Sequence, residues 1–320
     1  MSEQIAPAQI PALSGALIGG ANKVIIGAGE TVRLTVAALL CGGHILLEDL
    51  PGTGKTTLVK ALAVLTGCDS KRIQGTPDLM PADLTGFEIL DQDGTARTMR
   101  FREGPVFTNL LLADEINRMA PRTQAGLLEC MAEHQVTSGG KSYALPAPFF
   151  VIATQNPIEL QGTFPLPEAQ LDRFFMRLHM GTPTHAEELD ILADRQRTDP
   201  LDSLDAVTTP DAITAAQRAV REVHTSPAVL DYLLHLIEAT RNHPKLRYGL
   251  STRAALAVRH AAQAFAAMDG RDHILPDDIQ AVFPAVCAHR LQVSDGMLSD
   301  AAASEKLIGE LLTSVEVPKQ

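Results

Sequence analysis

A short stretch of the chain carries the residue types that bind phosphate groups. Two glycines, a lysine and a threonine follow one another closely in the run Leu46-Leu47-Glu48-Asp49-Leu50-Pro51-Gly52-Thr53-Gly54-Lys55-Thr56-Thr57. In such a glycine-rich loop the backbone N–H groups point at an anion, the lysine reaches the terminal phosphates, and the next hydroxyl holds Mg²⁺. The stretch predicts a phosphate-binding loop (P-loop), with candidate nucleotide-binding residues Pro51, Gly52, Thr53, Gly54, Lys55, Thr56 and Thr57, and with Thr56 on the metal ion.

Asp49 stands where the usual G-x-x-x-x-G-K-[ST] spacing has its first glycine. A carboxylate facing the phosphates would repel them, so we expect the Asp49 side chain to point away, at the end of the preceding strand. The alternative is an ordinary Pro-Gly turn. That alternative leaves unexplained the Lys-Thr pair, the apolar run before it and the helical spacing of Leu58, Leu62 and Leu65 after it.

A pair of acidic residues, Asp114 and Glu115, follows the apolar run Leu110 to Ala113. Ligands of parallel α/β sheets bind at the carboxyl ends of the strands, where this pair would lie. ATP hydrolysis needs an organised Mg²⁺ and an oriented water. Asp114 is the candidate ligand of Mg²⁺, and Glu115 is the candidate group that polarises the attacking water. The alternative is a solvated turn.

Three further polar residues stand at places that suit a reacting phosphate. Asn156 follows the apolar run Phe149 to Ala153 and would place an amide near the γ-phosphate or the water; the alternative is an exposed Asn-Pro turn. Arg253 falls in the first turn of a helix capped by Ser251, where a cation costs roughly 0.3–1 kcal/mol. A nearby anion such as the γ-phosphate would explain it, although the side chain could simply extend into water. Arg173 has no local explanation.

Apolar runs supply the strands that must position these residues. Continuous apolar runs are typical of buried parallel strands. We expect strands before the P-loop, at 70–74, at 110–113 and at 149–153, with a last strand after Phe174. Hairpins are expected at 86–101, around Asp93-Gly94, and at 135–145. The sequence therefore predicts an α/β domain with a parallel sheet.

The second half of the chain reads differently. Residues 185–315 show no convincing strand, and several X-Pro pairs separate helical patterns there. We expect an N-terminal arm at 1–20, either loose or partly helical, an α/β nucleotide domain at 21–184, and a helical domain at 185–320. Just after the arm, Val24, Ile25 and Ile26 form a small apolar patch. Ile25 could pack on a flat base such as adenine, or could belong to the core.

Bulk composition limits the classes of function. The chain has 320 residues, a net charge of −11 and 45% apolar residues, as in a soluble globular protein. The acidic balance argues against tight generic binding to nucleic acid. Four scattered cysteines and ten histidines show no zinc-site spacing, and the cysteines read as buried thiols. Without a signal peptide or a membrane-spanning run, the protein is expected in the cytoplasm.

With these residues in place, the chain resembles the AAA+ superfamily and, more narrowly, the MoxR family. The resemblance extends over about residues 20–292. It rests on the stretches GGHILLEDLPGTGKTTLVKALA, RIQGTPDLMPADLTG, FREGPVFTNLLLADEINRMAPRTQAGLLECM, FFVIATQNPIELQGTFPLPEAQLDRFFM, GLSTRAALA and GRDHILPDDIQAVFPAVCAHRL.

The resemblance implies a role for each candidate residue. Gly52 to Thr57 resemble Walker A, Asp114 and Glu115 resemble Walker B, and Asn156 matches sensor 1. Arg173 matches the arginine finger that acts on ATP in the neighbouring subunit, and Arg253 matches the sensor 2 arginine of the helical lid. The hairpin at 86–101 resembles the helix-2 insert. Arg118 and Arg122 lie in a stretch that resembles the family but have no assigned role. The effect of Asp49 on nucleotide affinity is left open.

The family implies a Mg²⁺-dependent ATPase that forms a ring, most simply a hexamer, and acts as a chaperone-like remodelling or maturation factor. Such proteins are linked to separate partners with von Willebrand factor A domains and to metal-cofactor insertion; neither nucleic acid nor a membrane segment is expected. Three alternatives stay open: a nucleic-acid motor of the same superfamily, a P-loop kinase or GTPase, and a regulatory switch that binds ATP with little turnover. DNA-stimulated hydrolysis or transfer of phosphate to a metabolite would indicate the first two.

Overall fold

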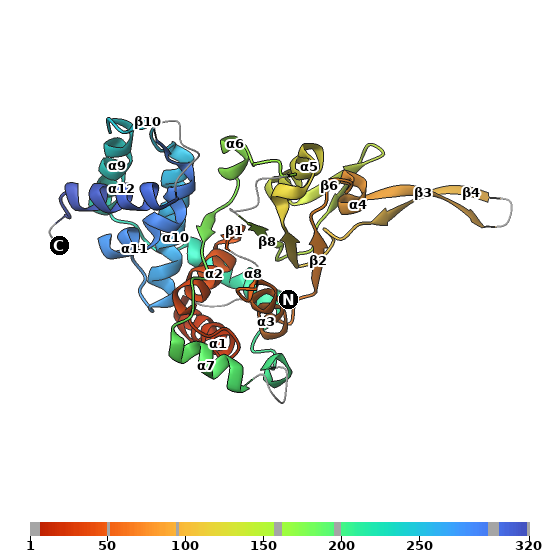
Figure 1. Cartoon of the computed structure of the whole chain (residues 1–320), viewed down its shortest axis with the longest axis horizontal. Coiled ribbons are helices and arrows are strands. Elements are labelled where there is room, and N and C mark those ends of the chain that lie inside the picture. Colours follow the sequence, from red (N-terminus) through yellow and green to blue (C-terminus); the bar gives the residue numbers. More distant parts are fainter. Residues whose placement is uncertain are drawn as a thin grey trace.

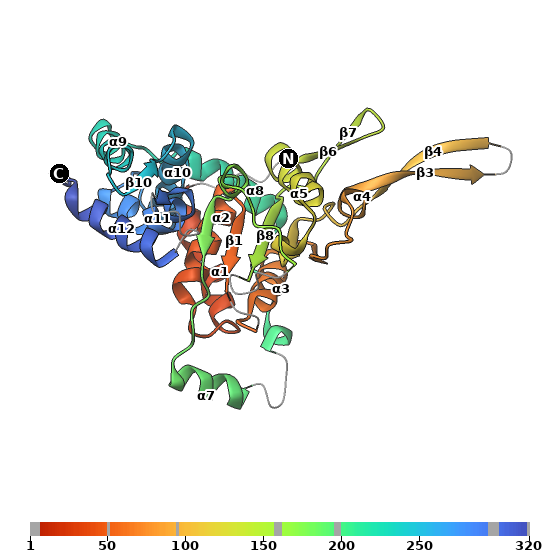
Figure 2. The ribbon, with the colours of Figure 1, turned by 45° about the horizontal axis from the view of Figure 1, so that its top comes forward.

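The computed structural model describes residues 7–49, 52–93, 96–156, 162–194, 200–293 and 301–318. An α/β domain with a parallel sheet occupies the centre, and the C-terminal helices gather on one side of it (Figure 1). On the opposite side a long hairpin projects away from the body, and the turned view shows the same projection (Figure 2). The α/β fold with a helical lid, predicted from the sequence, is confirmed.

The central sheet has five parallel strands in the order β2-β5-β8-β1-β9. They are β1 (Ile45–Glu48), β2 (Ser70–Gln74), β5 (Leu110–Asp114), β8 (Phe150–Gln155) and β9 (Met176–Leu178). Apart from β2, at the edge, these strands are buried almost throughout. Such burial on both faces explains their continuous apolar runs.

Alternate side chains of the strands enter two separate cores, one on each face of the sheet. Ile45 and Leu47 of β1 belong to the larger core, while Leu46 between them belongs to the smaller one. Helices α1 (Ile10–Asn22), α2 (Gly29–Cys41) and α3 (Lys55–Thr66) contribute to the larger core. Helix α5 (Pro121–Glu133) contributes to the smaller core on the other face.

Helix α1 lies in the region expected as an N-terminal arm. Ile10 and Leu17 are fully buried. A Cβ at Gly20 would come within 2.4 Å of the Leu65 side chain in α3, so the two helices approach closely at this glycine. The described part of the first twenty residues, the short 3-10 helix Pro7–Gln9 and then α1, is therefore not a loose leader. It is a helical part of the larger core.

The helical lid contains α8 (Pro210–Arg221), α9 (Pro227–Arg241), α10 (Thr252–Met268), α11 (Pro276–Cys287) and α12 (Ala301–Ser314). Ser251 caps α10 as predicted, and the side chains of Thr209 and Ser226 cap α8 and α9 at two of the X-Pro pairs. The helix α7 (His185–Asp194) and the 3-10 turn Pro200–Ser203 precede them.

The expectation that residues 185–315 contain no strand is wrong at one place. The short strands β10 (Leu246–Tyr248) and β11 (Gln292–Val293) pair antiparallel, with an irregular register. Neither is an apolar run, and strands of two or three residues leave no periodic signal in a sequence.

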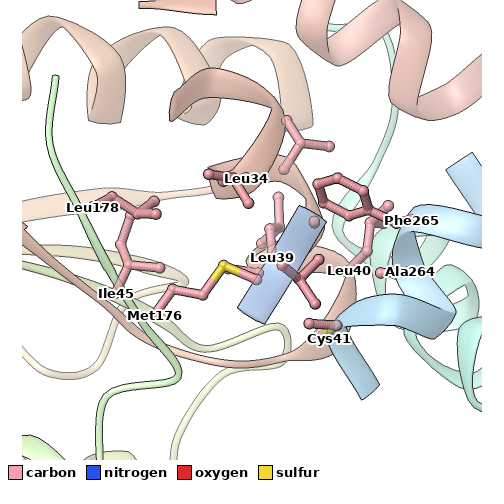
Figure 3. Close-up of a cluster of buried hydrophobic side chains, with 14 of the residues drawn as sticks. Leu34, Leu39, Leu40, Cys41, Ile45, Met176, Leu178, Ala264 and Phe265 are labelled. Carbon is pink, nitrogen blue, oxygen red and sulfur yellow. The ribbon is translucent and has the colours of Figure 1, made fainter. Parts of the chain in front are cut away.

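Helix α2 joins the lid to the sheet. Figure 3 shows Leu39, Leu40 and Cys41 of this helix together with Ile45 and Met176 of the sheet and with Phe265 of α10. The same helix also packs against α8. The lid and the α/β domain therefore share one continuous apolar core, although the sequence pattern separates them near residue 184.

Both predicted hairpins are present. β3 (Gly86–Asp93) pairs with β4 (Ala96–Glu103), and β6 (Gln135–Ser138) pairs with β7 (Lys141–Ala144). The rings of Phe101 in β4 and Tyr143 in β7 stack with centroids 4.1 Å apart. The remaining short elements are α4 (Pro81–Thr85), α6 (Glu168–Leu171) and the 3-10 turns Ile116–Arg118 and Ala288–Arg290. Among the helices of the described ranges, none has the length and apolar character to cross a membrane.

Candidate active site

A cavity of about 370 Å³ opens at the carboxyl ends of β1, β2, β5 and β8, the position at which open α/β sheets bind ligands. The sequence predicts most of the residues that surround it, and the structure brings these residues together from four strands and one helix. The lining residues are Asp49, Gly52, Gly54, Lys55, Thr56, Thr57, Arg72, Gln74, Asp114, Glu115, Thr154, Gln155 and Asn156.

The loop residues stand at the N-terminus of α3, with Gly54 as the N-cap at φ +88°. Gly52 has φ +89°, and a Cβ there would meet nothing within 4 Å. Backbone conformation therefore explains the glycine at position 52, because side-chain-bearing residues rarely adopt this φ. Helix N-termini with free N–H groups bind anions, which suits a phosphate in the cavity.

Lys55 extends along this loop. Its Nζ donates a hydrogen bond to the Asp49 carbonyl oxygen at 2.8 Å. Burial lowers the pKa of Lys55 from its ordinary value, while the charges of Asp49, Asp114 and Glu115 oppose that shift. Lys55 and the acidic pair, Asp114 and Glu115, therefore line the same cavity.

The Asp49 carboxylate lies at the end of the strand, as expected. Its Oδ2 accepts a hydrogen bond from the Met180 backbone N–H at 2.5 Å, just beyond β9. Burial raises the pKa of this carboxyl, against the Met180 hydrogen bond and the nearby charges of His179 and Lys55. Asp49 still borders the cavity, so its carboxylate is anchored beside the phosphate-binding loop.

Three other residues that the sequence predicts to bind nucleotide, Pro51, Thr53 and Ile25, are not among the described residues that line the cavity. Pro51 lies outside the described residues, and Thr53 is not among the lining residues. Ile25 is 5% exposed and belongs to the larger core. A Cβ at Gly54 would lie 3.9 Å from Ile25 Cδ1, so this side chain lies close to the loop. Its burial suits the core alternative, and contact with a base stays a prediction.

Asp114 is the last residue of β5 and Glu115 follows it, and both line the cavity. A single hydroxyl, that of Thr154 in β8, organises both: it donates to Asp114 Oδ1 at 2.5 Å and accepts from the Glu115 backbone N–H at 2.9 Å. Glu115 has φ +54°, a left-handed conformation uncommon for a residue with a side chain. Gly75 directly follows β2, and a Cβ on it would lie 2.2 Å from the Glu115 carbonyl oxygen. Only glycine therefore fits beside the backbone of Glu115 at this position.

Arginines hold the carboxylates of this acidic pair. Arg72 Nη2 lies 2.7 Å from Asp114 Oδ2, and Arg118 Nη1 lies 3.2 Å from Glu115 Oε2. Sequence reasoning missed Arg72 and Thr154, and it left Arg118 without a role. One local signal was available for Thr154, a hydroxyl at the end of an apolar strand. Arg122, also left without a role, is exposed at the start of α5.

The donor set suits Mg²⁺. This ion is usually held by one or two carboxylates, with the rest of its shell from waters and substrate phosphates. Asp114 supplies a carboxylate and Thr56 a hydroxyl to the same cavity. Within the described part of the chain no group of three or more His, Cys, Asp or Glu residues could hold a metal by itself. All four cysteines are buried free thiols.

Arg173 and Arg253 do not line the cavity of their own chain. Arg173 Nη1 donates to the Leu128 carbonyl oxygen of α5 at 2.9 Å. Arg253 pairs with Asp172 at 3.4 Å and its side chain is 66% exposed. The anion beside this helix terminus is Asp172, because α10 begins beside the segment between α6 and β9, and contact of Arg253 with a phosphate stays a prediction.

Comparison with known proteins agrees with the fold. Residues 44–176 match the profile of the ATPase family associated with various cellular activities (AAA), and residues 238–310 match the AAA lid domain. A crystal structure of a Cytophaga hutchinsonii protein superimposes with a TM-score of 0.87 at 34% identity, over 98% of this chain and 97% of the other. The protein is an AAA+ ATPase.

Two relatives narrow the assignment. The chain is 38% identical over 308 residues to "Chaperone MoxR1" of Mycobacterium tuberculosis, covering 93% of this chain and 80% of the relative. It is 44% identical to "Uncharacterized protein YeaC" of Bacillus subtilis over 96% of both chains. The chain belongs to the MoxR family of AAA+ ATPases.

Proposed function

We propose that this ATPase works as a ring, most simply a hexamer, in which each ATP is bound by one subunit and activated by arginines of the next. The observation that carries this proposal is the place of Arg173 and Arg253. Both are outside the cavity of their own chain, and Asp172 holds Arg253 beside the segment that contains Arg173. Two arginines on one surface suit a phosphate presented by a second copy.

Within one subunit, the cavity supplies binding and water activation. Gly52, Gly54 and the N-terminus of α3 receive the phosphates, and Lys55 neutralises the terminal ones. Thr56 and Asp114 would hold Mg²⁺, which supplies charge neutralisation on the phosphates when bound. The proposed step is attack of water on the γ-phosphate.

Glu115 and Asn156 are the residues proposed to act on that water. Glu115 lies next to the Mg²⁺ ligand and would accept the proton of the water. Arg118 pairs with one oxygen of the Glu115 carboxylate, Oε2, and the pair holds it weakly because both side chains are partly exposed. Asn156, at the end of β8, would orient the water or the γ-phosphate through its amide.

A mixing experiment tests the shared site. Arg173→Ala leaves the cavity of its own chain intact, and Lys55→Ala leaves Arg173 intact. Each variant alone should hydrolyse ATP poorly, since an arginine supplied in trans is worth roughly 10³–10⁵ in rate. Mixed together, they should recover turnover, because an intact cavity can then face an intact arginine. Full turnover by Arg173→Ala alone, or no recovery on mixing, contradicts the proposal.

We further propose that hydrolysis drives remodelling or maturation of partner proteins, including a separate partner with a von Willebrand factor A domain or a complex that receives a metal cofactor. Support comes from the name of the relative called a chaperone and from the projecting β3–β4 hairpin. Glu115→Gln should bind ATP and barely hydrolyse it, which holds the ring in its ATP state. Partners retained by this variant with ATP, and released with ADP, identify the client. Retention that ignores the nucleotide contradicts remodelling.

A further inference from the structure

The segment that carries Arg173 is a four-residue turn, 172–175, between α6 and β9. On one side the backbone N–H of Phe175 donates to the His44 carbonyl oxygen at 2.7 Å, which ties the turn to the sheet. Arg173 itself is exposed, and its guanidinium has a hydrogen bond to Leu128. The contact with the sheet thus fixes the end of the turn, and its first three residues, 172–174, donate backbone hydrogen bonds to carbonyl oxygens of α6.

The lid holds the same turn by other groups, the Asp172 carboxylate and the Phe174 carbonyl, through Arg290. Arg290 Nε donates to Asp172 Oδ1 at 2.8 Å, and its Nη2 donates to the Phe174 carbonyl oxygen at 2.7 Å. The guanidinium therefore bonds to the residues on both sides of Arg173. Its Nη1 also donates to the Val286 carbonyl oxygen of α11, which fixes the guanidinium to the helix that precedes its own 3-10 turn.

Burial makes this connection stiff. The Arg290 side chain is 6% exposed, whereas Arg253, which shares the Asp172 carboxylate, is 66% exposed. A buried charge that loses its partner is strongly destabilised, while an exposed pair contributes little. Asp172 is thus anchored by Arg290, and Arg253 can leave it at little cost.

His289 adds a second, uncharged bond from the lid. Its Nε2 donates to the same Phe174 carbonyl oxygen at 3.1 Å. Burial, together with the nearby charges of Arg290 and Arg177, lowers the pKa of His289 well below its ordinary value. The imidazole is therefore neutral at physiological pH, and Arg290 supplies the positive charge that Asp172 needs.

We propose that Arg290 is a positioning residue for Arg173: through Asp172 and the Phe174 carbonyl it fixes the Arg173 turn to the lid, so that the lid sets where Arg173 enters the neighbouring subunit's ATP site. This inference rests on the proposed function, since it presupposes that Arg173 acts in trans. Arg290 touches no ATP itself.

The test uses Asp172→Asn and Arg290→Lys in the full-length protein. Asparagine keeps an acceptor for Arg290 but removes the charge, and lysine keeps the charge but loses the planar fork. Because a misplacement of about 1 Å can cost roughly 10²-fold, turnover should fall ten- to hundredfold. KM for ATP should change less than about twofold, since the cavity of the same chain is untouched.

Mixing then separates positioning from a general structural effect. Each variant should regain turnover when mixed with Lys55→Ala, which contributes an intact Arg173 turn, and should not regain it with Arg173→Ala. Asp269→Asn is the matched control, because Asp269 also pairs with an arginine across the lid boundary, Arg33, but does not touch the Arg173 turn. This control should keep its turnover.

The outcomes distinguish the two proposals. If Lys55→Ala and Arg173→Ala fail to complement each other, the shared site is wrong, and this inference falls with it. If they do complement, three results overturn the positioning role alone. These are full turnover of both variants, recovery only with Arg173→Ala, and recovery with neither partner.

Discussion

At the scale of single residues, the Asp114 carboxylate at the end of β5 is paired with an arginine of the same chain, Arg72. Arg72 contacts the Asp114 oxygen that Thr154 does not use. Mg²⁺ needs a free carboxylate oxygen, so binding of the ion competes with this pair. The Arg72 side chain is 54% exposed, and exposed ion pairs contribute only about 0–1 kcal/mol. The competition is therefore mild.

We expect Arg72→Gln to bind Mg²⁺ more tightly, by up to about fivefold if the whole value of an exposed pair is released. A fluorescent ATP analogue titrated with Mg²⁺ measures this without turnover. Lys71→Gln is the control on the same strand, because Lys71 donates to the Phe107 carbonyl and does not line the cavity. Weaker Mg²⁺ binding by Arg72→Gln would instead mean that Arg72 holds the nucleotide.

At the scale of elements, one buried histidine joins three of them. His44 Nε2 donates to the Met131 carbonyl oxygen of α5 at 3.0 Å, and Nδ1 accepts from the Val151 N–H of β8 at 3.0 Å. His44 itself directly precedes β1. The bond from Val151 requires the neutral ring, since a protonated Nδ1 cannot accept, whereas Nε2 can donate in either state. Burial lowers the pKa of His44 to about 4.

This histidine makes the fold sensitive to acid. Between pH 6.5 and about 4 the unfolded chain takes up a proton at His44 that the folded chain refuses, so the free energy of unfolding falls as pH falls through this window. We expect His44→Gln to be less stable at pH 7, and its melting temperature to fall less than that of the wild type between pH 7 and pH 4.5. His235→Gln, at an exposed position of α9, should keep the wild-type slope. An unchanged slope in His44→Gln would contradict the assignment.

The elements also show what a sequence can and cannot predict. The loop at Gly52 to Thr56, the acidic pair and Asn156 were predictable because each is a local pattern next to an apolar strand. Arg72 was not, because its partner Asp114 is reached across a neighbouring strand 42 positions away. Thr154 carried a local signal, a hydroxyl at the end of an apolar strand, but its bond to Asp114 spans 40 positions and had none. The place of Arg253 depends on how the lid packs, and the packing of α1 depends on Gly20 meeting Leu65. No local spacing encodes either contact.

At the scale of the whole molecule, the proposed site between subunits would make activity depend on assembly. We expect turnover per subunit to rise with protein concentration and to level off once rings are complete, because an isolated subunit lacks the arginine in trans. Turnover measured over a dilution series, alongside sedimentation of the same samples with ATP, tests this. Constant turnover across concentrations at which sedimentation shows dissociation would contradict the shared site.

Helix α2, enclosed between the sheet and α10, has a mechanical consequence for such an assembly (Figure 3). A lid that swung freely on a hinge would have to separate Leu40 from Phe265 and expose both to water, a loss of roughly 1.5–3 kcal/mol for each side chain. The shared core therefore favours movement of the lid and the α/β domain as one unit. In the proposed ring, the motion that ATP drives would then occur at the boundaries between protomers, where Arg173 would face its neighbour.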